Sequence, residues 1–185
     1  MKPLFFLFIL SIVLSSCVSY QTNKEGGIRV NNPKEFKYNK HRFTTRQKQL
    51  IDTNAIYLLD SIFNPYYIPL FPAPKTKFVR FFSGGQLLFV KCLGMPSLAQ
   101  INNPNLGIQA YFFVDKDILK TDRFEELNGG QTGKYFGRIL PNGDIKFFEE
   151  RPTLFFGSIK TIEKGEYTIW KKIPVAGIDH YKPSW

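Results

Sequence analysis

The residues that could do chemistry are few and lie scattered along the chain. Only two histidines, His41 and His180, occur among the 185 residues, and no motif pairs either with a nucleophile or a carboxylate. Asp115 and Asp117 supply two nearby carboxylates, but they lack the glycine and the distal glutamate of a calcium loop. We therefore expect a non-enzymatic protein with no catalytic residues, no cofactor and no metal site.

The two cysteines are the remaining reactive side chains. Cys92 ends the strand-like run Leu87–Cys92, which predicts a buried thiol at a strand. Cys17 instead follows a short basic start, Met1-Lys2-Pro3, and the almost wholly apolar residues 4–14. A basic start, an apolar run and small residues before a break are typical of a secretory signal. The run is too short for a membrane span, which needs about 20 apolar residues.

The residues Leu14-Ser15-Ser16-Cys17 resemble the lipobox of bacterial lipoproteins. The resemblance implies that residues 1–16 are a signal peptide and that Cys17 becomes the mature N-terminus. It also implies a diacylglycerol on the Cys17 sulfur and a further acyl chain, such as palmitate, on its amine. The alternative is an ordinary secretory signal in which Cys17 is incidental. Val18 stands where inner-membrane lipoproteins carry Asp, which resembles an outer-membrane address and implies anchoring in the cell envelope, at the periplasmic face of the outer membrane.

Composition shifts divide the rest of the chain. Residues 17–40 are polar and rich in turn formers, which predicts a lipidated cysteine followed by a flexible tether. Residues 41–185 then form a single β-rich domain. The formal charge is +10, and removal of Lys2 with the signal leaves about +9. A basic stretch at 34–48 could meet anionic lipid, although a solvated basic face is the simpler interpretation. For a lipid-anchored envelope protein we expect no nucleic-acid partner.

Short apolar segments separated by glycine-bearing turns dominate the chain after residue 54. The pattern predicts strands at Asn54–Ile62 and Gly107–Val114. It also predicts three hairpins, with turns at 83–85, 141–143 and 163–165. Residues 118–124 read as a further strand, or 122–127 as a short helix. A short helix is expected near 44–51 and one helical turn at 97–101. The fold class is therefore mainly β: a single antiparallel meander, or up-and-down sheet, curled into a small barrel with one or two short helices.

Adjacent aromatic residues indicate that both faces of this sheet are covered. In Phe81-Phe82 and Phe147-Phe148 the two neighbours must point to opposite faces. The segments Phe81-Phe82-Ser83-Gly84-Gly85, Gly133-Lys134-Tyr135 and Asn142-Gly143-Asp144 resemble the lipocalin-like small β-barrel lipoproteins. That resemblance implies a small lipocalin-like barrel in the cell envelope.

These observations favour a binding or interaction module, joined to the membrane through Cys17. Its partner would be an apolar or amphipathic ligand held in the barrel, or another envelope protein. An open cavity lined by Phe and Tyr favours a ligand, and a filled interior favours protein docking. The alternatives are an envelope hydrolase that recruits His41 or His180, and a carbohydrate platform built on Tyr66, Tyr67 and Tyr111.

Overall fold

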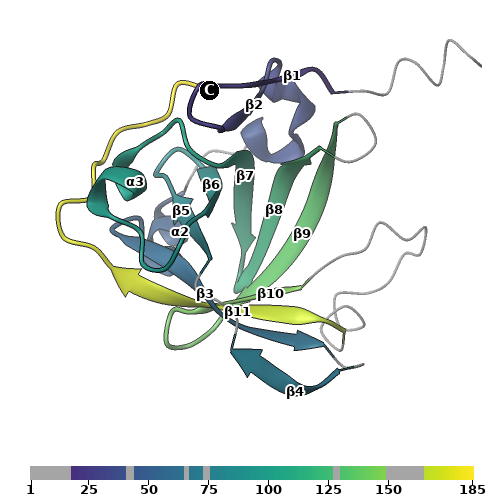
Figure 1. Cartoon of the computed structure of the whole chain (residues 1–185), viewed down its shortest axis with the longest axis vertical. Coiled ribbons are helices and arrows are strands. Elements are labelled where there is room, and N and C mark those ends of the chain that lie inside the picture. Colours follow the sequence, from purple (N-terminus) through teal and green to yellow (C-terminus); the bar gives the residue numbers. More distant parts are fainter. Residues whose placement is uncertain (1–17, 41–43, 65–66, 73–75, 127–129, 149–164) are drawn as a thin grey trace, which may run out of the picture.

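A computed structural model describes residues 18–40, 44–64, 67–72, 76–126, 130–148 and 165–185 (Figure 1). Cys17, His41 and residues 163 and 164 of the third predicted hairpin turn lie outside these residues. The strands are β1 (Tyr20–Thr22), β2 (Ile28–Val30), β3 (Ala55–Asn64), β4 (Tyr67–Pro72), β5 (Lys77–Phe81), β6 (Gln86–Lys91), β7 (Ile108–Asp115), β8 (Ile118–Glu125), β9 (Gln131–Ile139), β10 (Ile145–Phe148) and β11 (Tyr167–Pro174). The helices are α2 (Thr45–Leu50), α3 (Leu98–Asn102) and the 3-10 turns η1 (Pro33–Glu35) and η2 (Lys37–Lys40).

Eight of the described strands close into an antiparallel barrel. β3, β5, β6, β7, β8, β9, β10 and β11 pair in that order, and β11 pairs back with β3 over Tyr167–Pro174 (Figure 1). β4 pairs with β3 beside this ring. Each barrel strand therefore neighbours the one before it along the chain, apart from the insertion of β4. This arrangement confirms the predicted mainly β meander curled into a small barrel.

Successive side chains along each strand point alternately into and out of the barrel, so one sheet forms an apolar layer on each of its faces. In β6, Leu87 and Phe89 belong to the barrel interior, while Leu88 and Val90 pack on the outside. The turn before β6 places Gly85 at φ +88°, a conformation that glycine adopts without strain. The predicted hairpins around 83–85 and 141–143 are confirmed, and residues 118–124 belong to a strand rather than to a helix.

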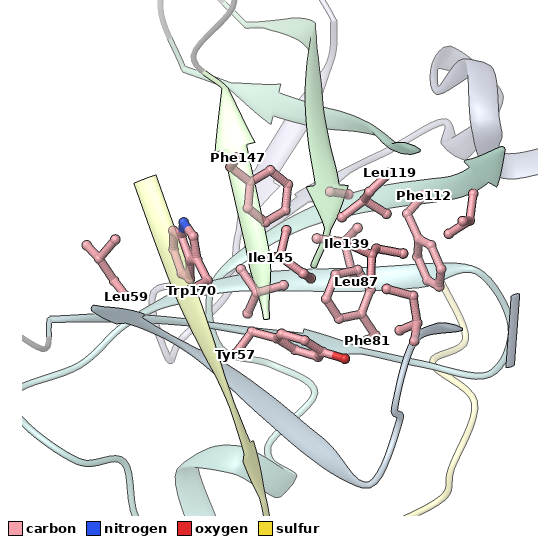
Figure 2. Packing of buried hydrophobic residues seen from close by; sticks show 14 residues of the cluster. Tyr57, Leu59, Phe81, Leu87, Phe112, Leu119, Ile139, Ile145, Phe147 and Trp170 are labelled. Atoms are coloured by element: carbon pink, nitrogen blue, oxygen red, sulfur yellow. The ribbon is translucent and has the colours of Figure 1, made fainter. Parts of the chain in front are cut away.

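The barrel interior is filled by aromatic and aliphatic side chains at one end. Phe81 lies edge-on to Tyr57 and Phe112, with ring centroids 5.1 and 4.8 Å apart (Figure 2). Ile51, just after α2, is 1% exposed and joins the same cluster. The backbone N–H of Asp52 donates to the Tyr57 hydroxyl over 3.1 Å, and burial raises the pKa of Tyr57 to about 12. The segment that follows α2 therefore packs into the closed end of the barrel.

The outer face of β5 and β6 is covered by α3 and the C-terminal residues. Phe82 packs beneath Tyr181 and Trp185, with centroids 5.5 and 6.4 Å away. Arg80 is 1% exposed and donates to the backbone carbonyls of Ile101 and Asp179, one in each covering segment. Desolvation lowers the pKa of this guanidinium. The prediction that Phe81 and Phe82 meet two covered faces is confirmed.

The segment before the barrel packs against it, so the expected flexible tether over residues 18–40 is wrong. Phe36 is 1% exposed and lies 5.0 Å, centroid to centroid, from Tyr111 on β7. Ile28 and Val30 of β2 are buried in the same cluster. Arg29 donates to the carbonyl oxygens of Gly107 and Leu106 over 2.8 and 3.1 Å. Sparse apolar residues between turn formers resemble a linker in sequence, but in the folded protein they pack against the outer surface of the barrel.

One buried carboxylate joins this segment to the barrel. Asp122 on β8 is 1% exposed, and its Oδ2 accepts the backbone N–H of Lys37 over 2.6 Å. Burial raises the pKa of the Asp122 carboxyl, although Lys37 and Lys134 act in the opposite direction. Protonation of Asp122 therefore favours the folded state. Its contribution to stability is fully present below the unfolded pKa and is lost as pH rises through the folded pKa.

We expect Asp122→Asn to remove this pH dependence. The amide oxygen of Asn can still accept the Lys37 N–H, whereas it does not ionise. The free energy of unfolding of the parent, minus that of Asp122→Asn, should fall as pH rises from about 4 towards 7. Urea unfolding at a series of pH values measures this difference. A difference that stays constant across the range would show that burial does not control this carboxyl.

Among the described residues, none of the helices has the length and apolar character needed to cross a bilayer.

Candidate functional site

A cavity of about 300 Å³ opens at the end of the barrel opposite α2. Strands β3, β6, β8 and β10 end at this mouth, and β5, β7, β9 and β11 begin there. The antiparallel meander therefore brings residues from all eight barrel strands to one opening. The lining residues are Leu59, Ile62, Lys77, Phe89, Val90, Lys91, Ile108, Arg123, Tyr135, Phe147, Glu166, Tyr167, Thr168 and Trp170.

Three aromatic rings form the inner wall of the cavity. Phe89, Phe147 and Trp170 have centroids 5.9–6.2 Å apart in each pairing. Phe147 and Trp170 project from neighbouring strands toward each other (Figure 2). The indole N–H of Trp170 donates to Thr168 Oγ1 over 2.7 Å, so its polar atom is satisfied within the protein. This wall offers apolar ring faces to anything that enters.

Arg123 brings a positive charge against this aromatic wall. Its guanidinium carbon lies 5.0 Å from the centroid of Phe89 and 4.1 Å from that of Tyr135. Nη2 donates to the Tyr135 hydroxyl over 2.7 Å and lies 3.9 Å from Glu125. The Tyr135 hydroxyl in turn donates to Glu125. The guanidinium is thus held by both ring stacking and hydrogen bonding, which fixes its position in the cavity.

The rim of the mouth carries further charge. Lys77 on β5 and Lys91 on β6 are direct cross-strand partners, and both line the cavity. Like charges placed opposite each other repel, so their pairing is unfavourable unless something else offsets it. Glu166 is the acidic lining residue, and its carboxylate accepts from the Asn64 side-chain amide. Three cationic side chains, Lys77, Lys91 and Arg123, therefore face one carboxylate among the lining residues.

A second depression lies at the opposite end of the barrel and has a different character. It measures about 420 Å³ and lies between residues 49–54 and 139–143. Lys172 lines it together with the turns at these two segments. The Lys172 ammonium lies 3.8 Å from the Asp52 carboxylate. Its walls are mostly polar and exposed, so it lacks the apolar surface that retains a small molecule.

Among the residues that the structure describes, those that the sequence marked for chemistry line neither depression. Asp115 pairs with Lys120 across the β7–β8 hairpin over 3.1 Å, and Asp117, in the turn of that hairpin, pairs with Arg138 on β9. His180 is exposed in the C-terminal segment. Cys92 is 8% exposed and burial raises the pKa of its thiol. Among the described residues, no three His, Cys, Asp or Glu side chains are arranged to hold a metal ion.

Tyr111, one of the three tyrosines predicted to stack on a carbohydrate, is not available for that role. Tyr111 is 5% exposed and lies beneath Phe36 and Trp185, so its ring cannot stack on a sugar. Tyr66 and the side chain of Tyr67 lie outside what the structure describes.

Sequence reasoning did not single out Arg123, Lys91 or Trp170. Period-two alternation through 119–125 places Leu119, Thr121 and Arg123 on one face, which could have indicated an inward-facing arginine. Comparison with models of known protein families, with curated proteins and with solved structures finds no match for this chain. The geometry of the cavity therefore carries the functional argument.

Proposed function

We propose that the barrel binds a small amphipathic molecule with an anionic head group. The apolar part occupies the cavity against Phe89, Phe147 and Trp170, and the head group lies near Lys77, Lys91 and Arg123. The observation that carries the proposal is an apolar, aromatic cavity whose lining is net positive. A volume of about 300 Å³ is at the lower end for ligand pockets, which favours a single short chain over a two-chain lipid.

The proposal includes a membrane anchor on Cys17, in line with the lipobox resemblance. The protein then acts as a lipid-anchored binding module in the cell envelope, at the periplasmic face of the outer membrane. The cavity lining supports binding rather than catalysis, because the side chains of Thr168 and Arg123 are fixed by partners within the protein, while Lys77 and Lys91 carry the charge of the rim. The Thr168 hydroxyl accepts from Trp170, and Arg123 bonds to Tyr135.

Calorimetric titration with two chains of equal length tests the preference for an anionic head. We expect dodecanoate to bind at least about ten-fold more tightly than dodecyltrimethylammonium, because their tails match and only the head-group charge differs. Equal affinities for the two probes would contradict the anionic head group. Failure of both probes to bind would contradict the cavity as a ligand site.

Lysine-to-glutamine variants at the two ends of the barrel locate the head group. We expect the double variant Lys77→Gln with Lys91→Gln to weaken dodecanoate binding about ten-fold, since two cations leave the mouth. Lys116→Gln removes the same kind of charge from the turn between β7 and β8, at the far end of the barrel. It should leave the affinity unchanged. An equal loss in both proteins would indicate a general charge effect and contradict head-group contact at the mouth.

A further inference from the structure

Strongly exposed apolar side chains lie beside the cavity, in the loop that joins β6 to α3. Leu93 is 96% exposed and Met95 is 56% exposed. Single exposed apolar residues are ordinary on protein surfaces. These two are separated by one glycine, and Leu98, at the start of α3, is a further 45% exposed. We call residues 92–97 the mouth loop.

The mouth loop is held in its conformation at both ends. The Cys92 N–H donates to the Thr76 carbonyl over 2.8 Å, and its thiol lies 3.3 Å from the carbonyl of Gly94. Gly94 has φ +72°, a turn that glycine adopts without strain. At the other end, Ser97 and Gln100 form a reciprocal capping box at the start of α3. Exposure of Leu93 and Met95 is therefore built into the local structure.

The loop continues the cationic rim of the barrel mouth. Leu93 comes two residues after Lys91, which lines the cavity beside Lys77. Ile62, another lining residue, is 42% exposed at the same opening. The mouth therefore presents apolar side chains next to Lys77 and Lys91. These two lysines repel each other, and an anionic surface would relieve that repulsion.

We infer that this rim docks on the surface of an anionic lipid bilayer, with Leu93 and Met95 entering the head-group region. Apolar side chains flanked by lysines are the combination that binds membrane interfaces: the apolar groups leave water and the cations contact lipid phosphates. Lys77 and Lys91 supply that charge complementarity at the mouth. The cavity then opens toward the bilayer. Leu93 and Met95 do not line the cavity, so their part in docking can be measured apart from ligand binding, whereas Lys77 and Lys91 take part in both.

Depth-dependent fluorescence on the full protein in vesicles tests the orientation. Met95→Cys and the matched control Gln49→Cys each carry a polarity-sensitive thiol probe, and Gln49 is an exposed α2 residue at the closed end. The parent protein treated with the same reagent supplies the background from Cys17 and Cys92. In phosphatidylcholine vesicles containing phosphatidylglycerol and a spin-labelled lipid, the probe at position 95 should shift to the blue and be quenched. The probe at position 49 should do neither.

Two further sets of variants separate the apolar contribution to docking from the electrostatic one. Leu93→Ser should return the probe at position 95 to the behaviour of the control. Lys77→Gln and Lys91→Gln should each lower the quenched fraction in anionic vesicles roughly five-fold, and have little effect in pure phosphatidylcholine. Equal quenching at positions 95 and 49, or none at either, would overturn the inference, and the second result would favour a protein partner for the rim. Leu93→Ser should bind dodecanoate as the parent does, which would show that Leu93 acts in membrane docking and not in ligand binding.

Discussion

Cys17→Ser is expected to abolish acylation and release the protein from the membrane fraction. The serine oxygen cannot replace the thioether that the lipobox resemblance places at this position. Each acyl methylene buried in the bilayer contributes about 0.8 kcal/mol, so two or three chains make an anchor that the rest of the protein cannot match. Metabolic labelling with a fatty acid, followed by fractionation, measures both effects.

Cys92→Ser is the matched control for this experiment. Cys92 is the other cysteine of the chain and is 8% exposed, so its replacement should leave the acyl label and the membrane location unchanged. Acyl label that persists in Cys17→Ser would contradict the anchor. If the label is lost, vesicle binding that survives weakly and reversibly would reflect the mouth loop alone, since a few side chains bind far less firmly than acyl chains.

Arg80→Met is expected to cause the largest loss of stability outside the barrel interior. The substitution removes the donor from the buried carbonyl of Ile101, at about 1–3 kcal/mol for an unsatisfied buried group, and from the partly buried carbonyl of Asp179, which costs less. Removal of a desolvated charge offsets part of this loss. We expect a net decrease of roughly 2 kcal/mol in the free energy of unfolding, measured by urea denaturation.

Arg80→Lys distinguishes the two hydrogen bonds from the charge. Lysine keeps the positive charge, but its single ammonium lacks the fork that reaches two separate segments. We expect most of the loss seen in Arg80→Met to appear in Arg80→Lys as well. Lys77→Met, a neutralising change at the exposed start of the same strand, should have little effect. If Arg80→Met unfolds at the parent's urea concentration, Arg80 does not hold α3 and the C-terminal segment to the barrel.

Most of the barrel could be predicted from local patterns. Alternation in β6 and glycine-bearing turns such as the one at 83–85 depend on neighbouring residues, and the structure confirms them. The helix near 44–51 follows from a capping pattern and forms as α2. The packing of residues 18–40 could not be predicted, because burial of Phe36 depends on a surface that β7 and β8 supply.

The sequence by itself determined that the chain forms a meander of short strands with apolar side chains on both faces, because strand period and turn chemistry are local. It also carries the lipobox resemblance at Cys17. Only the tertiary structure decided where the cavity lies and what charge it holds. Lys77 meets Lys91 through strand register, and Arg123 reaches Phe89 across a closed barrel. Such contacts join residues far apart in the chain, so they exist only once β11 has paired with β3 and β8 with β7.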